Sequence, residues 1–145
     1  MDSPSASGPG AAIPPSPPAG KRSGGANALA AAVLDHLRYR QALPLEYATR
    51  NDWYMALAFA VRDRMLDRYM ETLHAVTAPQ ANRKVVAYLS AEFLTGPHLG
   101  NNLLCLGMHE TAQEALSGLG QKLNDLLEQE EVPGIGNGGL GRLAA

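Results

Sequence analysis

The chain has 145 residues, of which 46% are hydrophobic and 18% are charged, a composition typical of a globular protein of about one domain. A formal net charge of -2 gives no electrostatic reason to expect nucleic acid or an anionic membrane as a partner. The single cysteine, Cys105, excludes an internal disulfide and a site of several thiolates, so we expect a buried thiol in a reducing compartment. There is neither a run of roughly 18 apolar residues nor a secretory signal, which predicts a cytoplasmic protein with no membrane span.

The first 26 residues are rich in proline, glycine, serine and alanine and offer almost nothing to bury. This composition predicts a disordered leader over residues 1–26. The composition changes at Asn27, which we expect to be the N-cap of a helix. The apolar side chains that can be brought to one side of this helix are Leu29, Val33, Leu37 and Tyr39.

A long amphipathic helix is predicted after a short loop that contains Pro44. Asn51 is a good N-cap residue, and apolar residues recur at every fourth position after it. We expect this stripe to pack in the core and the charged residues on the other side to face solvent. The stripe consists of Trp53, Leu57, Val61, Met65, Tyr69 and Leu73.

Residues 84–89, KVVAYL, are a short apolar run rich in β-branched residues, which predicts a strand. Its apolar positions are consecutive rather than alternating, so both faces should be covered, as in the central strands of an α/β sheet. Residues 98–131 have the pattern of short helices, interrupted by Gly107, Gly118 and Gly120.

A glycine cluster near the end of the sequence is the most informative local feature. It fits the spacing G-x-G-x-x-G twice and consists of Gly134, Gly136, Gly138, Gly139 and Gly141. A dinucleotide site would require a strand directly before the cluster, but an acidic helical stretch precedes it. Glycines also let backbone N–H groups at a helix start approach a phosphate, which predicts a phosphate-bearing ligand. The alternative is a glycine-rich turn that serves only close packing.

Other titratable residues form no recognisable site in the sequence. The carboxylates of Asp63, Glu92 and Glu131 are isolated, and the four histidines have no partner at zinc-ligand spacing. We expect surface or core roles for these residues and predict no metal site. A serine or cysteine nucleophile motif is also absent from the sequence.

Two segments resemble the glycogen/starch (α-glucan) phosphorylase family: YLSAEFLTGPHLGNNLLCLG at residues 88–107 and GIGNGGLGRLAA at 134–145. The two predicted helices before them also resemble the family, so the likeness covers nearly everything after Asn27. It implies an α/β fold class, in which residues 27–145 are an incomplete, mostly helical N-terminal domain with one apolar strand. The complete fold would be a two-domain, doubly wound glycosyltransferase.

The resemblance also implies an activity. Members of the family cleave terminal α-1,4 linkages of glycogen, starch or maltodextrin with inorganic phosphate and release glucose 1-phosphate. Pyridoxal phosphate is bound as a Schiff base by a lysine of the C-terminal domain, expected beyond Ala145, and its phosphate exchanges a proton with the substrate phosphate. A homodimer is implied for the full-length protein, and no catalytic residue is expected in this sequence.

Individual residues follow from the family's motifs. The phosphate-facing loop corresponds to Gly138, Gly139 and Leu140, and Leu94 stands where many members carry a tyrosine beside the cofactor. Glu92 matches the family's acid in the first motif. Regulation by AMP or phosphorylation is not predicted, since the residues that serve it in animal members are replaced here, among them Glu71 and Thr77.

The sequence supports three functional hypotheses. In the first, the chain is part of an α-glucan phosphorylase, is inactive on its own and exposes apolar surface. The second is a non-catalytic helical interaction module that docks to phosphorylase subunits. The third, a small dinucleotide-binding domain, would require a strand before Gly134.

Overall fold

The computed structural model describes residues 25–78, 83–90, 93–94, 96–131 and 134–135, and it gives side-chain surroundings for all of these except 93–94 and 134–135. The described elements are α1 (Ala26–Asp35), the π-helical turn η1 (His36–Arg40), the 3-10 turn η2 (Leu45–Tyr47), α2 (Arg50–Thr77), β1 (Phe93–Leu94), α3 (Leu99–Cys105), α4 (His109–Gly118), α5 (Leu123–Leu127) and β2 (Gly134–Ile135). No helix within these ranges is long and apolar enough to cross a membrane.

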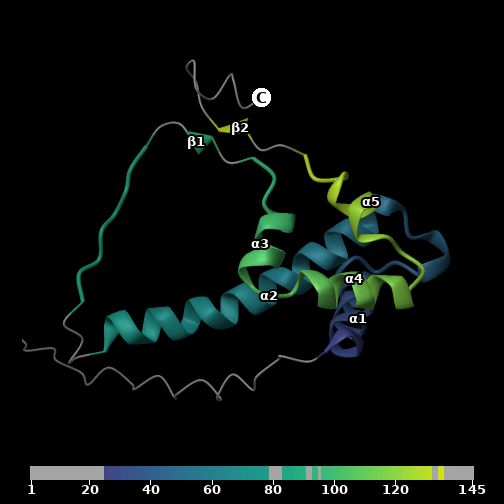
Figure 1. The fold of residues 1–145 in the computed structure, drawn as a ribbon, viewed down its shortest axis with the longest axis horizontal. Coiled ribbons are helices and arrows are strands. Elements are labelled where there is room, and N and C mark those ends of the chain that lie inside the picture. The colour runs from purple at the N-terminus through teal and green to yellow at the C-terminus, as the bar shows by residue number, and fades with distance from the viewer. Residues whose placement is uncertain (1–24, 79–82, 91–92, 95, 132–133, 136–145) are drawn as a thin grey trace, which may run out of the picture.

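The helices gather around one apolar core (Figure 1). Helix α1 lies against α2 and α4, and α3 and α5 pack on the same part of α2. Removing one large aliphatic side chain from water contributes roughly 1.5–3 kcal/mol, so this core is the main source of stability. Its largest fully buried members are Leu29, Leu37, Leu57, Leu103, Leu116, Leu126, Val33 and Val61.

The predicted apolar side of the first helix is confirmed up to Leu37 and wrong at Tyr39, which is 74% exposed. The reason is the π-helical turn η1, which follows α1 directly. Tyr39 lies within this turn, and because a π-helical turn contains more residues than an α-helical turn, its side chain leaves the face that α1 buries.

Both predicted N-caps are wrong. Asn27 lies inside α1, which begins at Ala26 and has Gly25 as its cap. Helix α2 is capped by Thr49 rather than Asn51, through a reciprocal capping box with Asp52. The Thr49 hydroxyl accepts the Asp52 N–H at 3.3 Å, and the Thr49 N–H donates to the Asp52 carboxylate at 2.8 Å. These bonds need an acid three residues after the cap, which Asn51 does not have.

Glycines end two of the short helices, as the sequence predicts. Gly107 follows α3 with a φ of 66°, and Gly120 follows α4 with a φ of 72°. This left-handed conformation is favourable for glycine because it has no Cβ atom. The chain therefore reverses twice within a short distance, and α3, α4 and α5 each return to α2 or α1.

The apolar stripe of α2 is buried only in the first half of the helix. Trp53, Leu57 and Val61 belong to the core, whereas Met65 and Tyr69 are 39% and 56% exposed. Helix α2 is 28 residues long, and its second half extends beyond the other helices (Figure 1). Periodicity identified the apolar face correctly, but the packing partners cover only part of its length.

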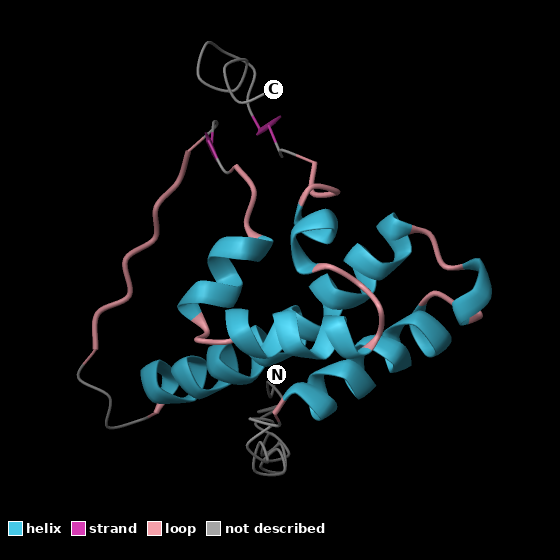
Figure 2. Cartoon of the chain, turned by 45° about the vertical axis from the view of Figure 1, so that its right-hand side comes forward, coloured by secondary structure: helices cyan, strands magenta, loops and turns pink. Residues whose placement is uncertain are grey.

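The predicted strand at residues 84–89 is wrong. This segment is extended but pairs with no strand among the described residues, and it runs apart from the helices (Figure 2). Its valines, Val85 and Val86, are 77% and 89% exposed. A β-branched run favours extended backbone, but a strand also needs a neighbour for its N–H and C=O groups. The described part of the chain is therefore mostly helical.

Cys105 is exposed, contrary to the buried thiol expected from the sequence. Helix α3 buries Leu99 and Leu103, which lie one turn apart on the same face. Cys105 follows Leu103 by two positions, about 200° around the helix axis, and therefore faces away from the core.

The capping box should stabilise α2 measurably. Hydrogen bonds from Thr49 hold the pKa of Asp52 below its ordinary value of 3.8, with the side-chain bond the larger cause. Thr49→Ala should lower the free energy of unfolding by about 1 kcal/mol at neutral pH, measured by urea denaturation. Because the pKa of this carboxyl is lower in the folded than in the unfolded state, the ionised carboxylate stabilises the fold at pH values above 3.8. This stabilisation is lost as the pH falls through the folded-state pKa. The difference from the wild type should therefore shrink as the pH falls below 3.8.

Thr72→Ala is the matched control, because Thr72 is exposed in the same helix and its hydroxyl only donates to the Arg68 carbonyl one turn earlier. Alanine is the better helix former, so this variant should be as stable as the wild type or slightly more stable. Equal losses in both variants would contradict the capping role of Thr49.

The exposed segment 84–89 should promote self-association of the isolated chain. An extended, exposed apolar run with no neighbouring strand among the described residues is a template for strand pairing between molecules. Val86→Lys places a charge at the centre of the run and should shift the chain toward monomer in sedimentation velocity. Thr72→Lys adds the same charge on exposed α2 and should have no effect. Association that persists unchanged in Val86→Lys would locate the contact elsewhere.

Candidate functional site

The two segments that carry the sequence motifs meet in the structure. Strands β1 and β2 form a two-stranded antiparallel sheet, in which Phe93 is the partner of Ile135 and Leu94 is the partner of Gly134. Figure 1 shows the two strands side by side although they are far apart in the sequence. Gly134 is the first glycine of the cluster, so the fold brings Leu94 directly to the start of the glycine run.

The side chain of Glu130 ties the same two segments together a short distance away. Its carboxylate accepts the His98 N–H at 2.6 Å and the Leu99 N–H at 2.9 Å and 3.2 Å through its two oxygens. These donors are free backbone groups at the start of α3, where the helix itself provides no acceptor. A carboxylate there is also favoured by the helix dipole. Sequence analysis missed Glu130, because no local pattern relates an acid to amides 31 and 32 residues away.

Tyr54 on α2 is close enough to this contact for the charge of Glu130 to affect its ionisation. The residue is half-buried on α2 and packs against the buried cluster. Burial raises the pKa of the Tyr54 phenol above its ordinary value of 10.0, and the negative charges of Glu130 and Glu131 raise it further. The start of α3 and the residues after α5 therefore meet through Glu130, and Tyr54 of α2 lies within electrostatic range of this contact.

The predicted site residues are only partly covered by the described residues. Leu94 lies in β1, opposite Gly134. Gly138, Gly139 and Leu140 fall outside the described residues, as does Glu92. The phosphate-facing loop therefore stays a prediction, and only Gly134, the first glycine of the cluster, is placed by the structure, opposite Leu94.

The dinucleotide-binding hypothesis is not supported by this geometry. Helix α5 ends at Leu127, and residues 128–131 form a turn and an irregular stretch. Strand β2 has two residues and pairs antiparallel to β1, whereas the dinucleotide motif follows a parallel strand of a βαβ unit.

A second polar cluster links η1 to α2. The His36 ring nitrogen lies 3.1 Å from the Asp63 carboxylate, and the ring contacts Phe59 at a centroid distance of 5.8 Å. The Arg40 guanidinium lies over the same Phe59 ring, 3.7 Å from the ring centroid. Asp63 is therefore paired rather than simply solvated. Within the described ranges, no group of histidine, cysteine and acidic residues could hold a metal ion.

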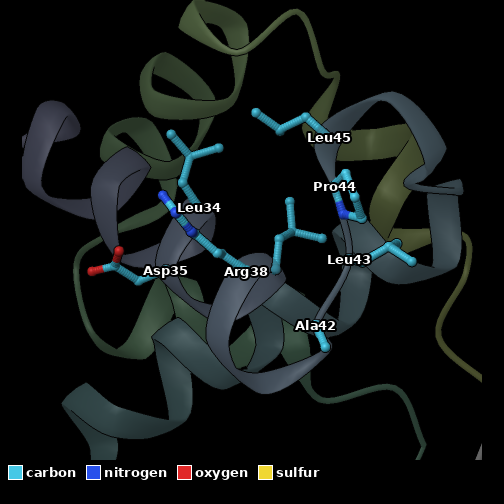
Figure 3. A pocket seen from close by; sticks show the side chains of 8 residues that line it. Leu34, Asp35, Arg38, Ala42, Leu43, Pro44 and Leu45 are labelled. Atoms are coloured by element: carbon cyan, nitrogen blue, oxygen red, sulfur yellow. The ribbon is translucent and has the colours of Figure 1, made fainter.

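A pocket of about 630 Å³ lies beside η1, away from the strand pair. Its walls are mainly apolar, with Asp35 and Arg38 as the charged residues at one side (Figure 3). None of the predicted site residues lines it. The lining residues are Leu34, Asp35, Leu37, Arg38, Ala42, Leu43, Pro44 and Leu45.

Comparison with known proteins gives a consistent result. No protein-family model matches the chain. The chain is 52% identical over 114 residues to a glycogen phosphorylase of Synechocystis, which covers 79% of this chain and 13% of the relative. It is 45% identical over 98 residues to a glycogen phosphorylase of Pasteurella multocida, and 42% identical over 110 residues to the brain form of glycogen phosphorylase of Bos taurus. These two matches cover 68% and 76% of this chain but 12% and 13% of the relatives.

The chain therefore belongs to the glycogen phosphorylase family, and it spans about 13% of the length of the curated relatives that it matches. The resemblance in the motif segments is thus part of a similarity that extends over most of the sequence.

The pKa of Tyr54 provides a test of the geometry around Glu130. Glu131→Gln should lower this pKa but leave it above 10.0, because burial is the larger cause of the shift. The measurement is an NMR titration of the Tyr54 ring. Glu128→Gln is the control, since Glu128 does not contribute to the shift, and it should leave the titration unchanged. The raised pKa stabilises the fold below pH 10.0, and this contribution is lost as pH rises through the folded-state value.

Proposed function

We propose that the chain is the N-terminal part of an α-glucan phosphorylase. In this proposal the complete protein cleaves terminal α-1,4 linkages of glycogen, starch or maltodextrin with inorganic phosphate and releases glucose 1-phosphate. The observation that carries it is the pairing of Leu94 with Gly134, which brings together the two motif segments in a member of the phosphorylase family. A chain that used these segments only for packing would not require both motifs at one place.

The proposed role of the site is to bind phosphate through backbone amides. Gly138, Gly139 and Leu140 would direct their N–H groups toward a phosphate group, because residues without bulky side chains allow close approach of the backbone. Leu94 would lie beside the same ligand, as its pairing with Gly134 supports.

The ligand phosphate in this proposal belongs to pyridoxal phosphate. The short distance along the chain from Gly134 to Gly138 fits a cofactor that touches both the glycine run and residue 94. When bound, this cofactor would supply a phosphate group that exchanges a proton with the substrate phosphate. The residues of this chain would orient that phosphate and limit access of water. The Schiff-base lysine would come from the C-terminal domain.

The same proposal covers the whole protein. It would be a two-domain, doubly wound glycosyltransferase, a homodimer in the cytoplasm, with an α-1,4-glucan and inorganic phosphate as its substrates. Residues 27–145 alone would be inactive, because positioning of both substrates depends on groups outside them.

A second candidate is a non-catalytic interaction module that docks to phosphorylase subunits. One observation favours it: α1 to α5 enclose an apolar core of their own, from Leu29 to Leu126. A helical unit with such a core can fold without the rest of the protein. Stable binding of the folded chain to a full-length phosphorylase would support this candidate.

The test of the proposed function is a chimera. Residues 27–145 would replace the matching segment of the Synechocystis glycogen phosphorylase, and release of glucose 1-phosphate from maltodextrin would be measured. We expect an active chimera, whereas the 145-residue chain alone should show no activity. A folded chimera that binds pyridoxal phosphate but is inactive would overturn the proposal.

A glycine substitution in the chimera tests the site itself. Gly139→Val should reduce the rate about 100-fold or more, because a branched side chain prevents close approach of the backbone amides to phosphate. Gly118→Ala is the matched control, since a Cβ atom at Gly118 meets open space within α4. Equal activity in both variants would remove the glycine run from the phosphate site.

A further inference from the structure

Within the described residues, the strand pair at the candidate site joins two residues of each strand, Phe93–Leu94 and Gly134–Ile135. An isolated two-stranded hairpin is only marginally stable in water even when it is longer. A one-residue slip would pair Leu94 with a different residue and change which glycines lie opposite it. A contact that aligns the two segments outside these four residues would therefore help to hold the register.

The Glu130 carboxylate is in the position to do this. His98 follows Leu94 by four residues, and Glu130 precedes Gly134 by four residues, so the contact continues the antiparallel register of the strand pair. The bonds are charge-assisted, which makes them about twice as strong as neutral ones. One carboxylate engages two consecutive amides, so a shift along either segment would break at least one bond.

We propose that Glu130 is a positioning residue of the phosphorylase site, whose carboxylate sets the register in which Leu94 pairs with Gly134. This inference rests on the proposed function for its biological meaning, but the register itself is measurable in the isolated chain. Glu130 does not touch the ligand in this proposal; it acts through the strand pair.

The surroundings of Glu130 support a fixed position for the carboxylate. Tyr54 on α2 lies near enough for the charge of Glu130 to affect its ionisation. The two hydrogen bonds from the Leu99 N–H to the carboxylate are partly buried, so this side chain is not fully solvated. Glutamine is a poor replacement, because its amide has one acceptor oxygen and would turn a donor toward a donor.

The alternative is a purely local role, in which Glu130 only caps α3. The two roles can be separated, because the side chain of the N-cap residue can itself cap α3 in place of Glu130. His98 is the N-cap residue of α3 and its side chain makes no cap hydrogen bond. His98→Asp would provide a local cap and stabilise α3 without any bond to residue 130.

The experiment measures backbone hydrogen exchange by mass spectrometry in the 145-residue chain. Glu130→Ala should raise the exchange rate about tenfold in peptides that contain 93–94 and 134–135, because hydrogen bonds to a charged group are lost. Glu131→Gln is the matched control: Glu131 is adjacent and equally charged but bonds to neither amide, so exchange should stay at the wild-type rate.

The double variant Glu130→Ala with His98→Asp decides between the roles. Glu130→Ala should also lower the thermal midpoint of unfolding, because α3 loses its cap. If Glu130 positions the site, the added His98→Asp should restore this midpoint, while hydrogen exchange at 93–94 and 134–135 stays fast. Recovery of both would reduce Glu130 to a helix cap and overturn the inference. Unchanged exchange in Glu130→Ala alone would overturn it as well.

The chimera then connects the register with function. Glu130→Ala in the chimera should raise the KM for phosphate several-fold, while Glu131→Gln should not. If the parent chimera is inactive, the proposed function fails, but the exchange measurements still decide whether Glu130 sets the register. An active chimera with an unchanged KM in Glu130→Ala would overturn the positioning role.

Discussion

The apolar contact between α1, α4 and the first half of α2 determines where everything else in the described structure lies. Helix α2 provides the surface on which α3 and α5 pack, and these helices bring the segments before and after them to the same side. The strand pair and the Glu130 contact are small by comparison and depend on this support. The candidate site is thus built at the edge of a helical core, from chain segments that the core holds close together.

The Glu130 contact illustrates how a polar interaction can be specific without being a large source of stability. It satisfies amides that would otherwise lack an acceptor, and it does so only when two distant segments are correctly aligned. Burial of leucine side chains stabilises the fold but tolerates small shifts along a helix. The hydrogen bonds of one carboxylate do not tolerate such shifts, which makes them suited to define a register.

Two surfaces of the described structure expose apolar side chains that could pack against further polypeptide. The second half of α2 and the segment 84–89 present large apolar side chains to solvent. The relatives that the chain matches are several times longer, since the match covers about 13% of their length. These surfaces are where the described unit would gain most from contact with further polypeptide or with another molecule.

Periodicity, composition and local motifs were enough to predict the buried helix faces, two helix ends and the protein family without any structure. The spacing of Leu29, Val33 and Leu57 defined the buried faces of the helices, because a helix places every third or fourth residue on one side. Gly107 and Gly120 marked helix ends because glycine accepts the left-handed conformation. The motif segments at 88–107 and 134–145 were sufficient to indicate the phosphorylase family.

Tertiary structure decided the properties that depend on a partner. Whether the apolar run at 84–89 becomes a strand depends on a neighbour, and no strand lies beside it among the described residues. Exposure of Tyr69 depends on how far the other helices extend along α2. The contact of Glu130 with His98 joins residues that no local pattern connects, and it depends on the packing of both α3 and α5 on α2. The sequence by itself therefore determined which segments are helical and which family they belong to, and only the packing decided which apolar faces are covered and how the two motifs meet.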